Sequence, residues 1–410
     1  MACHDEPGML TVEVCRARLL AAVPAPGTGE SVALTDAIGR VTSGAINAVH
    51  DVPPADNSAM DGYAIHQADL HSANNHAQLL MIGDSFAGHP FNGELQPGQC
   101  VRIMTGANVP QGAAAVIMQE HVQRHDNHVQ LQRQLQPAEN IRRRGEDIRT
   151  GEVLLKPGHH LRAADIGLLA SQGIATVPVQ RRLRVALIST GDELVPTGQP
   201  LGPGQIYDSN RAMLHAALSD AGFAVIDMGH VADDAEALRQ RFVEADASAD
   251  VVITSGGVSV GEADLVRQVI AEIGDIHIWK IAIKPGKPFA FGTLPNSVFF
   301  GLPGNPVSAL VTLTQLAMPA LITMQGGTWQ APLTMQARLL APVKKKPGRA
   351  DYQRGIVSQG EQGELQVTPL GNQGSGVLTS MSKANCFIVL AQDQGSVPQG
   401  EYVTVEPFWR

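Results

Sequence analysis

Short apolar runs alternate with amphipathic stretches between about residue 180 and residue 328, and this alternation constrains the fold more than any other feature of the chain. Runs such as LRVALIST, ADVVITS and VFFGL have the length and composition of buried strands. The stretches SNRAMLHAALSDAG and AEALRQRFVEADA instead repeat apolar residues at helical spacing. Strands that alternate with helices in this way form a parallel sheet with helices on both faces. We therefore predict a doubly wound parallel α/β domain over residues 179–328.

The rest of the chain predicts three further parts, which 410 residues can accommodate. Residues 51–145 contain β-type runs such as CVRIMTG and AAAVIMQEHV between Gly, Pro and Asn turns, which predicts a β-rich module. Helical signals in VEVCRARLLAAV and RAADIGLLASQG predict a small helical linker domain made of residues 1–50 and 146–178. Residues 329–410 contain short apolar runs bounded by turns, which predicts a C-terminal antiparallel β-barrel-like domain.

The charge balance argues against a nucleic-acid-binding protein. The formal net charge is -9, so no general polyanion-binding surface is expected. Aromatic residues make up 4% of the chain, which is too few for a base-stacking platform. Any phosphate-binding site must therefore be confined to a small part of the surface.

The sequence favours a cytoplasmic protein without a membrane partner. The N-terminus MACHDEPGML lacks the basic region and long apolar core of a signal peptide. No charged residue occurs from Pro288 to Ala337, but the most apolar part of this segment contains Ser, Thr, Gln and Pro319. It therefore predicts a buried core helix rather than a membrane span.

Five loops at the predicted carboxyl edge of the sheet carry the polar residues expected of a ligand site. Gly256 and Gly257 would allow backbone N–H groups to approach a phosphate. Lys284 and Lys287 add positive charge, while a hard divalent cation could be held by Glu193, Asp233 and Asp264. Each loop also has a plain structural interpretation, since Gly-rich turns often only reverse the chain and Asp233 or Asp234 can cap a helix. Together they predict phosphate binding with Mg²⁺.

Other nucleotide-binding and hydrolase motifs fit this sequence less well. The P-loop pattern and the dinucleotide pattern G-x-G-x-x-G are absent. The run Gly257–Gly261 matches the G-x-S-x-G nucleophile elbow of a serine hydrolase. The triad needs a later histidine, however, and His277 follows closely within an apparent strand, which disfavours a hydrolase.

Two upstream segments have no obvious structural role. DNSAMDGYA, residues 56–64, is neither alternating nor helical in pattern. IRRRGED, residues 141–147, places three arginines beside two acids. Such a run either forms a solvated face or meets an anionic ligand.

Seven motifs in chain order resemble the molybdopterin molybdenumtransferase (MoeA) family: DNSAMDGYA, RIMTGA, IRRRGEDI, STGDEL, TSGGVSVGEAD, KPGKPFAFG and GLPGNPVSA. The resemblance implies transfer of molybdenum from molybdate to the dithiolene of adenylylated molybdopterin, with Mg²⁺ and release of AMP. It also implies a homodimer and an α/β domain similar to that of the enzyme that adenylylates molybdopterin, which becomes a candidate partner.

The resemblance also implies roles for individual residues. The implied catalytic residues are Asp61, Thr105, Asp147, Glu193, Asp233 and Asp264, of which Glu193 and Asp264 would be the Mg²⁺ ligands. The implied substrate and molybdate contacts are Gly256, Gly257, Lys284, Lys287, Pro303, Pro306, Arg354 and Ser375. The chain departs from the family pattern in the long loop His66–Leu79 and at Gly376, where a larger residue is expected.

Asp61 and Thr105 fall in the predicted β-rich module, far in sequence from Glu193 and Lys284. Two-fold symmetry would let each subunit complete the site of its partner, so we expect one site to draw on both subunits. Relatives within larger eukaryotic proteins also act as non-catalytic scaffolds, which leaves a second functional class open.

Overall fold

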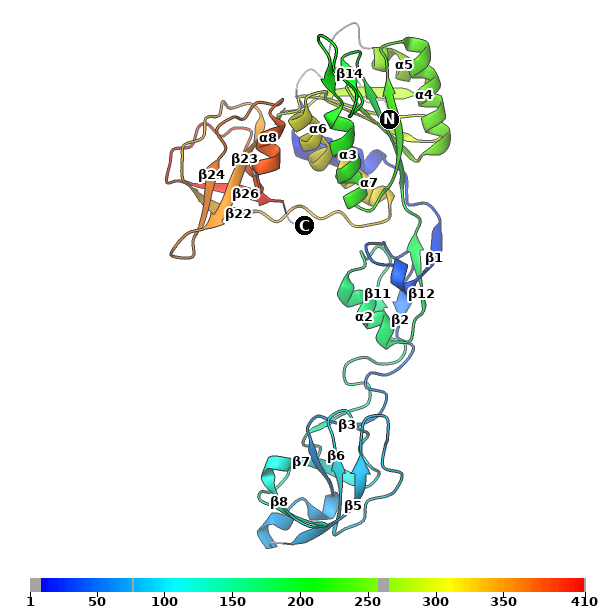
Figure 1. The fold of residues 1–410 in the computed structure, drawn as a ribbon, viewed down its shortest axis with the longest axis vertical. Helices are drawn as coiled ribbons and strands as arrows, with labels where there is room; N and C mark the ends of the chain where they lie inside the picture. Colours follow the sequence, from blue (N-terminus) through cyan, green and yellow to red (C-terminus); the bar gives the residue numbers. More distant parts are fainter. Residues whose placement is uncertain (1–8, 76, 257–264, 409–410) are drawn as a thin grey trace. The chain divides into compact units, whose positions relative to one another are not determined.

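The computed structural model describes residues 9–75, 77–256 and 265–408. The chain divides into two compact units (Figure 1). Unit 1 consists of Met1–Ser43, Gly158–Arg162 and Thr176–Arg410, and unit 2 consists of Gly44–Pro157 and Ala163–Ala175. Each unit has its own hydrophobic core.

A six-stranded sheet forms the centre of unit 1, in the order β16-β13-β17-β21-β20-β18. The strands are β13 (Arg184–Thr190), β16 (Ala224–Val231), β17 (Val251–Ser255), β18 (Asp275–Lys280), β20 (Pro288–Thr293) and β21 (Val298–Leu302). The first four in the sheet order are parallel, whereas β20 is antiparallel to both of its neighbours. The doubly wound α/β fold is confirmed, with one difference: β20 makes the sheet mixed rather than parallel throughout. The run PFAFGT, which was not predicted as a strand, turns back along β18 and forms β20.

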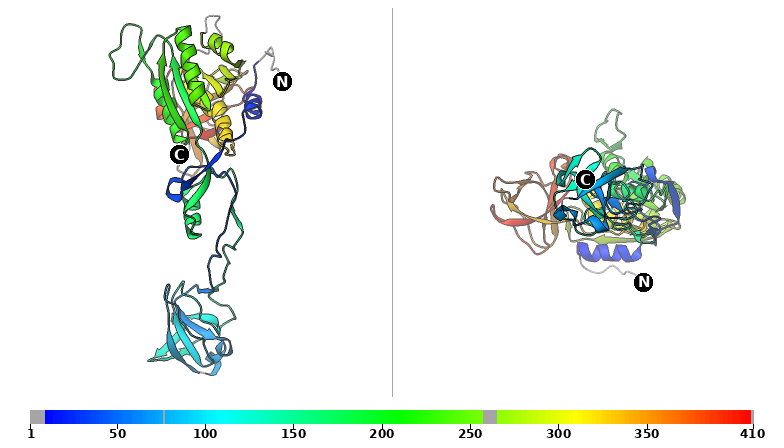
Figure 2. Two further views of the ribbon diagram at one scale, coloured as in Figure 1. Left: turned by 90° about the vertical axis from the view of Figure 1, so that its right-hand side faces the viewer. Right: turned by 90° about the horizontal axis from the view of Figure 1, so that it is seen from below.

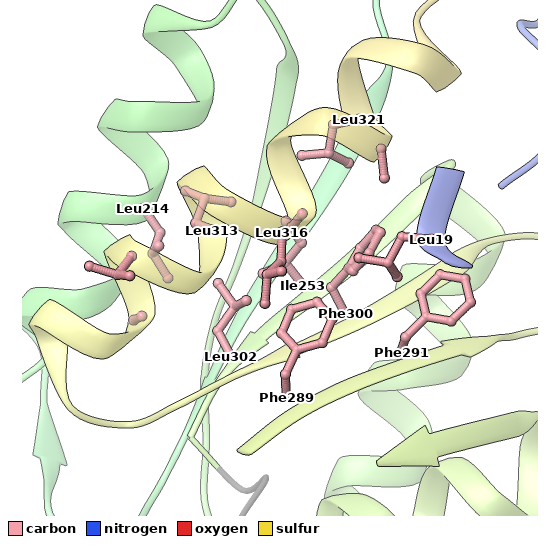
Figure 3. Close-up of a cluster of buried hydrophobic side chains, with 14 of the residues drawn as sticks. Leu19, Leu214, Ile253, Phe289, Phe291, Phe300, Leu302, Leu313, Leu316 and Leu321 are labelled. Carbon is pink, nitrogen blue, oxygen red and sulfur yellow. The ribbon is translucent and has the colours of Figure 1, made fainter. Parts of the chain in front are cut away.

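Helices cover both faces of this sheet because neighbouring strand residues point to opposite sides. Val185 and Leu187 enter one core with α1, α3, α6 and α7, while Ala186 and Ile188 enter the other with α4 and α5. Figure 3 shows the first core. The helices are α1 (Val12–Ala22), α3 (Ser209–Asp220), α4 (Ala235–Ser248), α5 (Leu265–Ile273), α6 (Pro306–Thr312) and α7 (Met318–Met324), with the π-helix η5 (Leu313–Ala317) between the last two.

The helical run Pro306–Met324 is the predicted uncharged core helix. It is long and apolar enough to cross a membrane, alone among the described helices, yet 72% of its most apolar window is buried inside unit 1. Leu313, Leu316 and Leu321 pack against the sheet (Figure 3). Such burial is typical of the core helix of a globular domain.

Helix α1 packs on the α/β core through Val12, Cys15 and Leu19, which are almost fully buried. In Figure 2 it lies in blue beside the yellow α7 segment. The second predicted helix, α2 (Ala163–Ser171), belongs to unit 2. The apolar face of α1 is used by the α/β core, whereas α2 belongs to unit 2, and the helical linker domain expected from the sequence stays a prediction. The residue limits of the predicted domains stay predictions.

The C-terminal part of unit 1 is a closed barrel. Its strands are β22 (Met335–Leu339), β23 (Ala350–Gln359), β24 (Leu365–Pro369), β25 (Cys386–Leu390) and β26 (Tyr402–Pro407), with α8 (Leu378–Lys383) before β25. The ring closes through pairing of β23 with β25. The barrel prediction is confirmed, with one difference: β22 and β24 pair in parallel. The short strand β19 (Ile283–Lys284) from the α/β part also pairs with β23.

Unit 1 also contains short pairs and turns outside these sheets. These are β1 (Gly29–Ala33) with β12 (Thr176–Gln180), β14 (Leu194–Val195) with β15 (Ile206–Tyr207), and η1 (Leu34–Asp36).

Unit 2 is built on a six-stranded sheet in the order β7-β4-β6-β5-β9-β8. The strands are β4 (Gly62–His66), β5 (Gln78–Ser85), β6 (Gln99–Ile103), β7 (Ala113–Met118), β8 (Val122–His125) and β9 (His128–Leu131). Its smaller elements are β2 (Ile46–Asn47), β3 (Asn57–Ser58), β10 (Ile141–Arg142), β11 (Val153–Leu155), η2 (Gln67–Asp69), η3 (Ser72–Asn75) and η4 (Gln119–His121). Gly62 is required at the β4–β7 contact, because a Cβ there would lie 1.8 Å from the Ile117 carbonyl oxygen.

Candidate functional site

A cleft of about 880 Å³ opens at the carboxyl edge of the α/β sheet in unit 1. The loops after β13, β16, β17 and β21 line it, together with the segment between β18 and β20. The barrel completes the lining with Arg349, just before β23, and with the loop around Ser375. The cleft therefore lies where open α/β sheets bind ligands.

Most of the site residues predicted in this part of the chain line this one cleft. They are Glu193, Asp233, Gly256, Lys284, Lys287, Pro303 and Ser375. Pro306 lines a smaller adjoining hollow, which it shares with Glu193 and Gly256. Gly257 and Asp264 lie outside the described residues, as does the G-x-S-x-G run Gly257–Gly261.

One part of the cleft is acidic. Glu193 folds back over Gly191, which has φ +135°, and a Cβ on that glycine would lie 2.6 Å from Glu193 Oε2. The backbone N–H of Asp233 donates to Asp192 Oδ1 at 3.0 Å. Partial burial and the charges of Asp192 and Glu193 raise the pKa of Asp233. The carboxylates therefore repel one another, and a cation would relieve that repulsion.

Another part of the cleft is basic and surrounds the loop KPGKP. Lys284 and Lys287 line the cleft with Arg349. Lys284 Nζ lies 3.0 Å from Asp351 Oδ2. Gly286 has φ +115°, and a Cβ there would lie 2.6 Å from Thr312 Cγ2 on α6. The loop thus fits closely against the helix only because it carries glycine at this position.

Arg354 holds in place a loop that lines the cleft. Its side chain is almost fully buried and does not line the cleft. The guanidinium donates to Ser380 Oγ at 3.0 Å and to the Gly374 carbonyl at 3.0 Å. The loop that it holds is also fixed to α6, because the Val307 N–H donates to the Ser375 carbonyl at 3.0 Å. Its predicted direct contact with molybdate stays a prediction.

The floor of the cleft consists of closely packed backbone. Gly256 has φ +96°, and a Cβ there would lie 2.7 Å from the Thr190 carbonyl oxygen. Asn210 Nδ2 joins two loops by donating to Ser255 Oγ at 2.8 Å and to the Gly304 carbonyl at 2.7 Å. Thr190 lines the cleft, and its buried hydroxyl has no hydrogen-bond partner among the described residues.

Sequence reasoning missed several lining residues, namely Thr190, Asn305, Arg349 and Gln373. Arg349 could have been found, because it follows a Pro-Gly turn five residues before the predicted Arg354. Thr190 and Asn305 lie next to predicted strand ends and within the motifs STGDEL and GLPGNPVSA, which could have singled them out. Gly376, the departure from the family pattern, leaves room for a larger residue, since a Cβ would make only an ordinary contact at 3.9 Å.

The predicted residues of unit 2 include one hydrogen-bonded pair. Asp61 Oδ1 accepts from both the backbone N and the Oγ1 of Thr105, each at 2.7 Å. These bonds lower the pKa of Asp61, which stays ionised at neutral pH. Asp147 is exposed, and its backbone N–H donates to the Val52 carbonyl at 3.0 Å.

The arginine run in unit 2 is paired with acidic residues. Arg143 Nη1 lies 2.5 Å from Asp56 Oδ2, and Arg144 Nε lies 2.5 Å from Asp51 Oδ2. Hydrogen bonds from Thr150 and Arg144 lower the pKa of Asp51 to about 2. Two of the three arginines therefore join IRRRGED to the segment that contains DNSAMDGYA.

Within the described ranges, no group of three or more His, Cys, Asp or Glu side chains is arranged to hold a metal ion. A magnesium ion needs fewer protein ligands than this, because it keeps several waters and binds substrate phosphates.

The chain matches three family descriptions along its length. These are the MoeA N-terminal region (domain I and II) over residues 10–173, a probable molybdopterin binding domain over residues 186–323, and the MoeA C-terminal region (domain IV) over residues 336–408. The resemblance inferred from the seven motifs is thereby confirmed.

Relatives and solved structures agree with this match. A molybdopterin molybdenumtransferase of Haemophilus influenzae is 46% identical over 402 residues, which cover 98% of this chain and 99% of the relative. One of Nostoc is 37% identical over 92% of this chain and 88% of the relative. The crystal structure of a molybdopterin biosynthesis MoeA protein from Pyrococcus horikoshii has a TM-score of 0.81 and 34% identity, covering 98% of this chain and 100% of that one. The chain belongs to the molybdopterin molybdenumtransferase (MoeA) family.

Proposed function

We propose that this protein transfers molybdenum from molybdate to the dithiolene of adenylylated molybdopterin and releases AMP. The observation that carries the proposal is the mixed charge of one cleft: Glu193 and Asp233 line it together with Lys284, Lys287 and Arg349. Such a cleft can hold an oxyanion and a phosphate-bound cation at the same time. Relatives named molybdopterin molybdenumtransferase support the same activity.

The basic residues are suited to bind molybdate as substrate. Ammonium and guanidinium groups form charge-assisted hydrogen bonds with a tetrahedral oxyanion. Lys284, Lys287 and Arg349 supply such groups, and Ser375 lies in the same lining. These side chains would hold the oxyanion beside the sulfur atoms of the pterin substrate without forming a covalent bond to the protein.

The acidic residues fit a magnesium ion. Partial burial, followed by the charges of Asp192 and Glu193, raises the pKa of Asp233, so a cation would stabilise its ionised form. Carboxylate oxygens are the ligands that Mg²⁺ accepts, together with waters and substrate phosphates. Glu193 would hold the ion, with Asp264 as the second ligand implied by the family resemblance. When bound, Mg²⁺ would supply charge neutralisation at the phosphate oxygens of the adenylylated substrate.

We also propose a cytoplasmic homodimer that receives its substrate from the enzyme that adenylylates molybdopterin. Asp61 and Thr105 belong to unit 2 and are not among the residues that line the cleft of unit 1. A two-fold dimer would let residues from two subunits serve one reaction.

The two alternative functions have less support. The relatives are named as transferases, which gives no support to a serine hydrolase. A non-catalytic scaffold would not require an acidic and a basic cluster in one cleft of this size.

Release of AMP from adenylylated molybdopterin is expected to require both molybdate and Mg²⁺. The physical reason is that the basic groups of the cleft bind molybdate and the acidic groups bind Mg²⁺, so each ion is needed. Four reactions, with and without each ion, are compared by quantifying AMP chromatographically. The proposal predicts AMP only in the reaction with both ions, and equal release without molybdate would overturn it.

A matched pair of variants tests whether the Mg²⁺ requirement arises from Glu193. At the Mg²⁺ concentration that saturates the wild-type protein, Glu193→Gln is expected to lose AMP release. The Mg²⁺ concentration needed for half-maximal release should rise, because an amide binds the cation more weakly than a carboxylate. Glu236→Gln, at an exposed acid in the first turn of α4, is the control and should leave that concentration unchanged.

A further inference from the structure

Asp351 is a buried carboxylate directly behind the cleft. The whole residue is 2% exposed, and its Oδ2 lies 3.0 Å from Lys284 Nζ. The side chain of Lys284 is 43% exposed, so the pair joins a cleft-lining ammonium to an interior acid. Asp351 itself does not line the cleft.

The carboxylate is held in place by its surroundings. Gln353 Nε2 donates to the same Oδ2 at 3.1 Å and also to the Lys344 carbonyl at 2.9 Å. Lys345 is buried nearby and interacts electrostatically with both Asp351 and Lys284. Asp351 is thus fixed by neutral and cationic groups and has little freedom to follow a mobile lysine.

Backbone pairing fixes the same two positions. Lys284 on β19 pairs in parallel with Asp351 on β23, and the Ala350 N–H donates to the Ala282 carbonyl at 2.7 Å. The pairing joins the KPGKP loop of the α/β part to a strand of the barrel. Both the backbone and the ammonium of Lys284 are therefore placed by the barrel.

We propose that Asp351 is a positioning residue for the oxyanion substrate: it orients the Lys284 ammonium at the cleft and so makes the barrel part of the molybdate-binding apparatus. This inference rests on the proposed function. A flexible lysine loses rotamer freedom when it binds a ligand, and an interior carboxylate that restricts it beforehand lowers this cost.

A carboxylate this close to an oxyanion site would also repel the substrate. Lys345 offsets part of this repulsion, because its charge also attracts Asp351. Without the carboxylate, the repulsion between Lys284 and Lys345 would no longer be offset at Lys284, whereas Lys345 would keep the attraction of Asp393. The repulsion would therefore displace the more exposed Lys284. We therefore expect loss of Asp351 to weaken oxyanion binding.

The test is a double-mutant cycle read by calorimetry with molybdate on the full-length protein. Asp351→Asn is expected to raise the molybdate Kd about tenfold, as loss of a residue that orients a ligand group commonly does. The Kd for adenylylated molybdopterin should stay the same. In the Lys284→Ala background, Asp351→Asn should change the molybdate Kd by less than about twofold, because its effect is transmitted through the lysine.

Matched variants separate positioning from folding. Asp246→Asn removes another buried carboxylate, which accepts bonds from Asn296 and Ser297 remote from the cleft, and should leave the molybdate Kd unchanged. If Asp351→Asn lowers the thermal unfolding temperature more than Asp246→Asn does, the molybdate Kd of Asp351→Glu is measured as well. It keeps the charge and should retain more molybdate affinity than Asn.

Each outcome decides the proposal. Unchanged or tighter molybdate binding in Asp351→Asn would overturn it, and so would an equal loss with and without Lys284. If Lys284→Ala itself leaves molybdate binding unchanged, the oxyanion role of Lys284 and the positioning role of Asp351 both fail. Molybdate-dependent AMP release by the wild-type protein tests the proposed function separately.

Discussion

Mixing Asp61→Ala protein with Glu193→Gln protein is expected to restore molybdate-dependent AMP release that neither protein has by itself. Asp61 lies in unit 2, hydrogen-bonded to Thr105, whereas Glu193 lines the cleft of unit 1. If each site of the proposed homodimer uses one of these residues from each subunit, a mixed dimer has one site with both changes and one with neither.

Statistical exchange makes half of the dimers mixed, so activity should recover to about a quarter of the wild-type value. Differently tagged subunits would measure how many mixed dimers form. Glu120→Ala, at another exposed acid of unit 2, is the control and should stay active before mixing. Mixed dimers that form and remain inactive would contradict a site shared between subunits.

Lys284→Ala is expected to weaken molybdate binding far more than binding of the adenylylated pterin. The change removes one ammonium from the basic part of the cleft, and with it the cation that lies 3.0 Å from Oδ2 of the buried Asp351. Loss of a hydrogen bond to a charged group costs about 1.5–3 kcal/mol, which corresponds to a roughly 10- to 150-fold higher Kd. Calorimetry with molybdate and with the pterin substrate measures the two effects.

Lys383→Ala provides the matched control. Lys383 lies in the last turn of α8 in the same unit, is exposed, and does not line the cleft. Its loss changes the net charge of the protein as Lys284→Ala does, so it should leave both Kd values unchanged. Equal weakening of both ligands in Lys284→Ala would contradict a specific oxyanion role.

The α/β core was predictable because its local patterns agree with its packing. Strands such as VALIS contribute alternate residues to two cores, and the flanking helices carry apolar residues at the matching spacing. The antiparallel direction of PFAFGT was not predictable in this way. A central antiparallel strand that is buried on both faces has the same sequence pattern as any other short apolar run. The packing of α1 against the α/β core likewise depends on residues far away in the sequence, so the local pattern could not predict it.

The residues of the candidate site also differ in whether local sequence patterns or long-range packing determine their positions. Glu193, Asp233 and Lys284 could be predicted because strand-end loops of an α/β sheet converge at one edge. The buried position of Arg354 could not, since it depends on how the barrel packs against that edge. Asp351 gave no signal, because a carboxylate within an apolar strand does not reveal which lysine it contacts.

The central claim is that release of AMP is coupled to the transfer of molybdenum. The most direct measurement is to isolate the pterin product of a single incubation and to quantify its molybdenum and the AMP released from the same sample. The account predicts equal molar amounts of the two, with both lost in Glu193→Gln. AMP formed without molybdenum in the pterin product would contradict it.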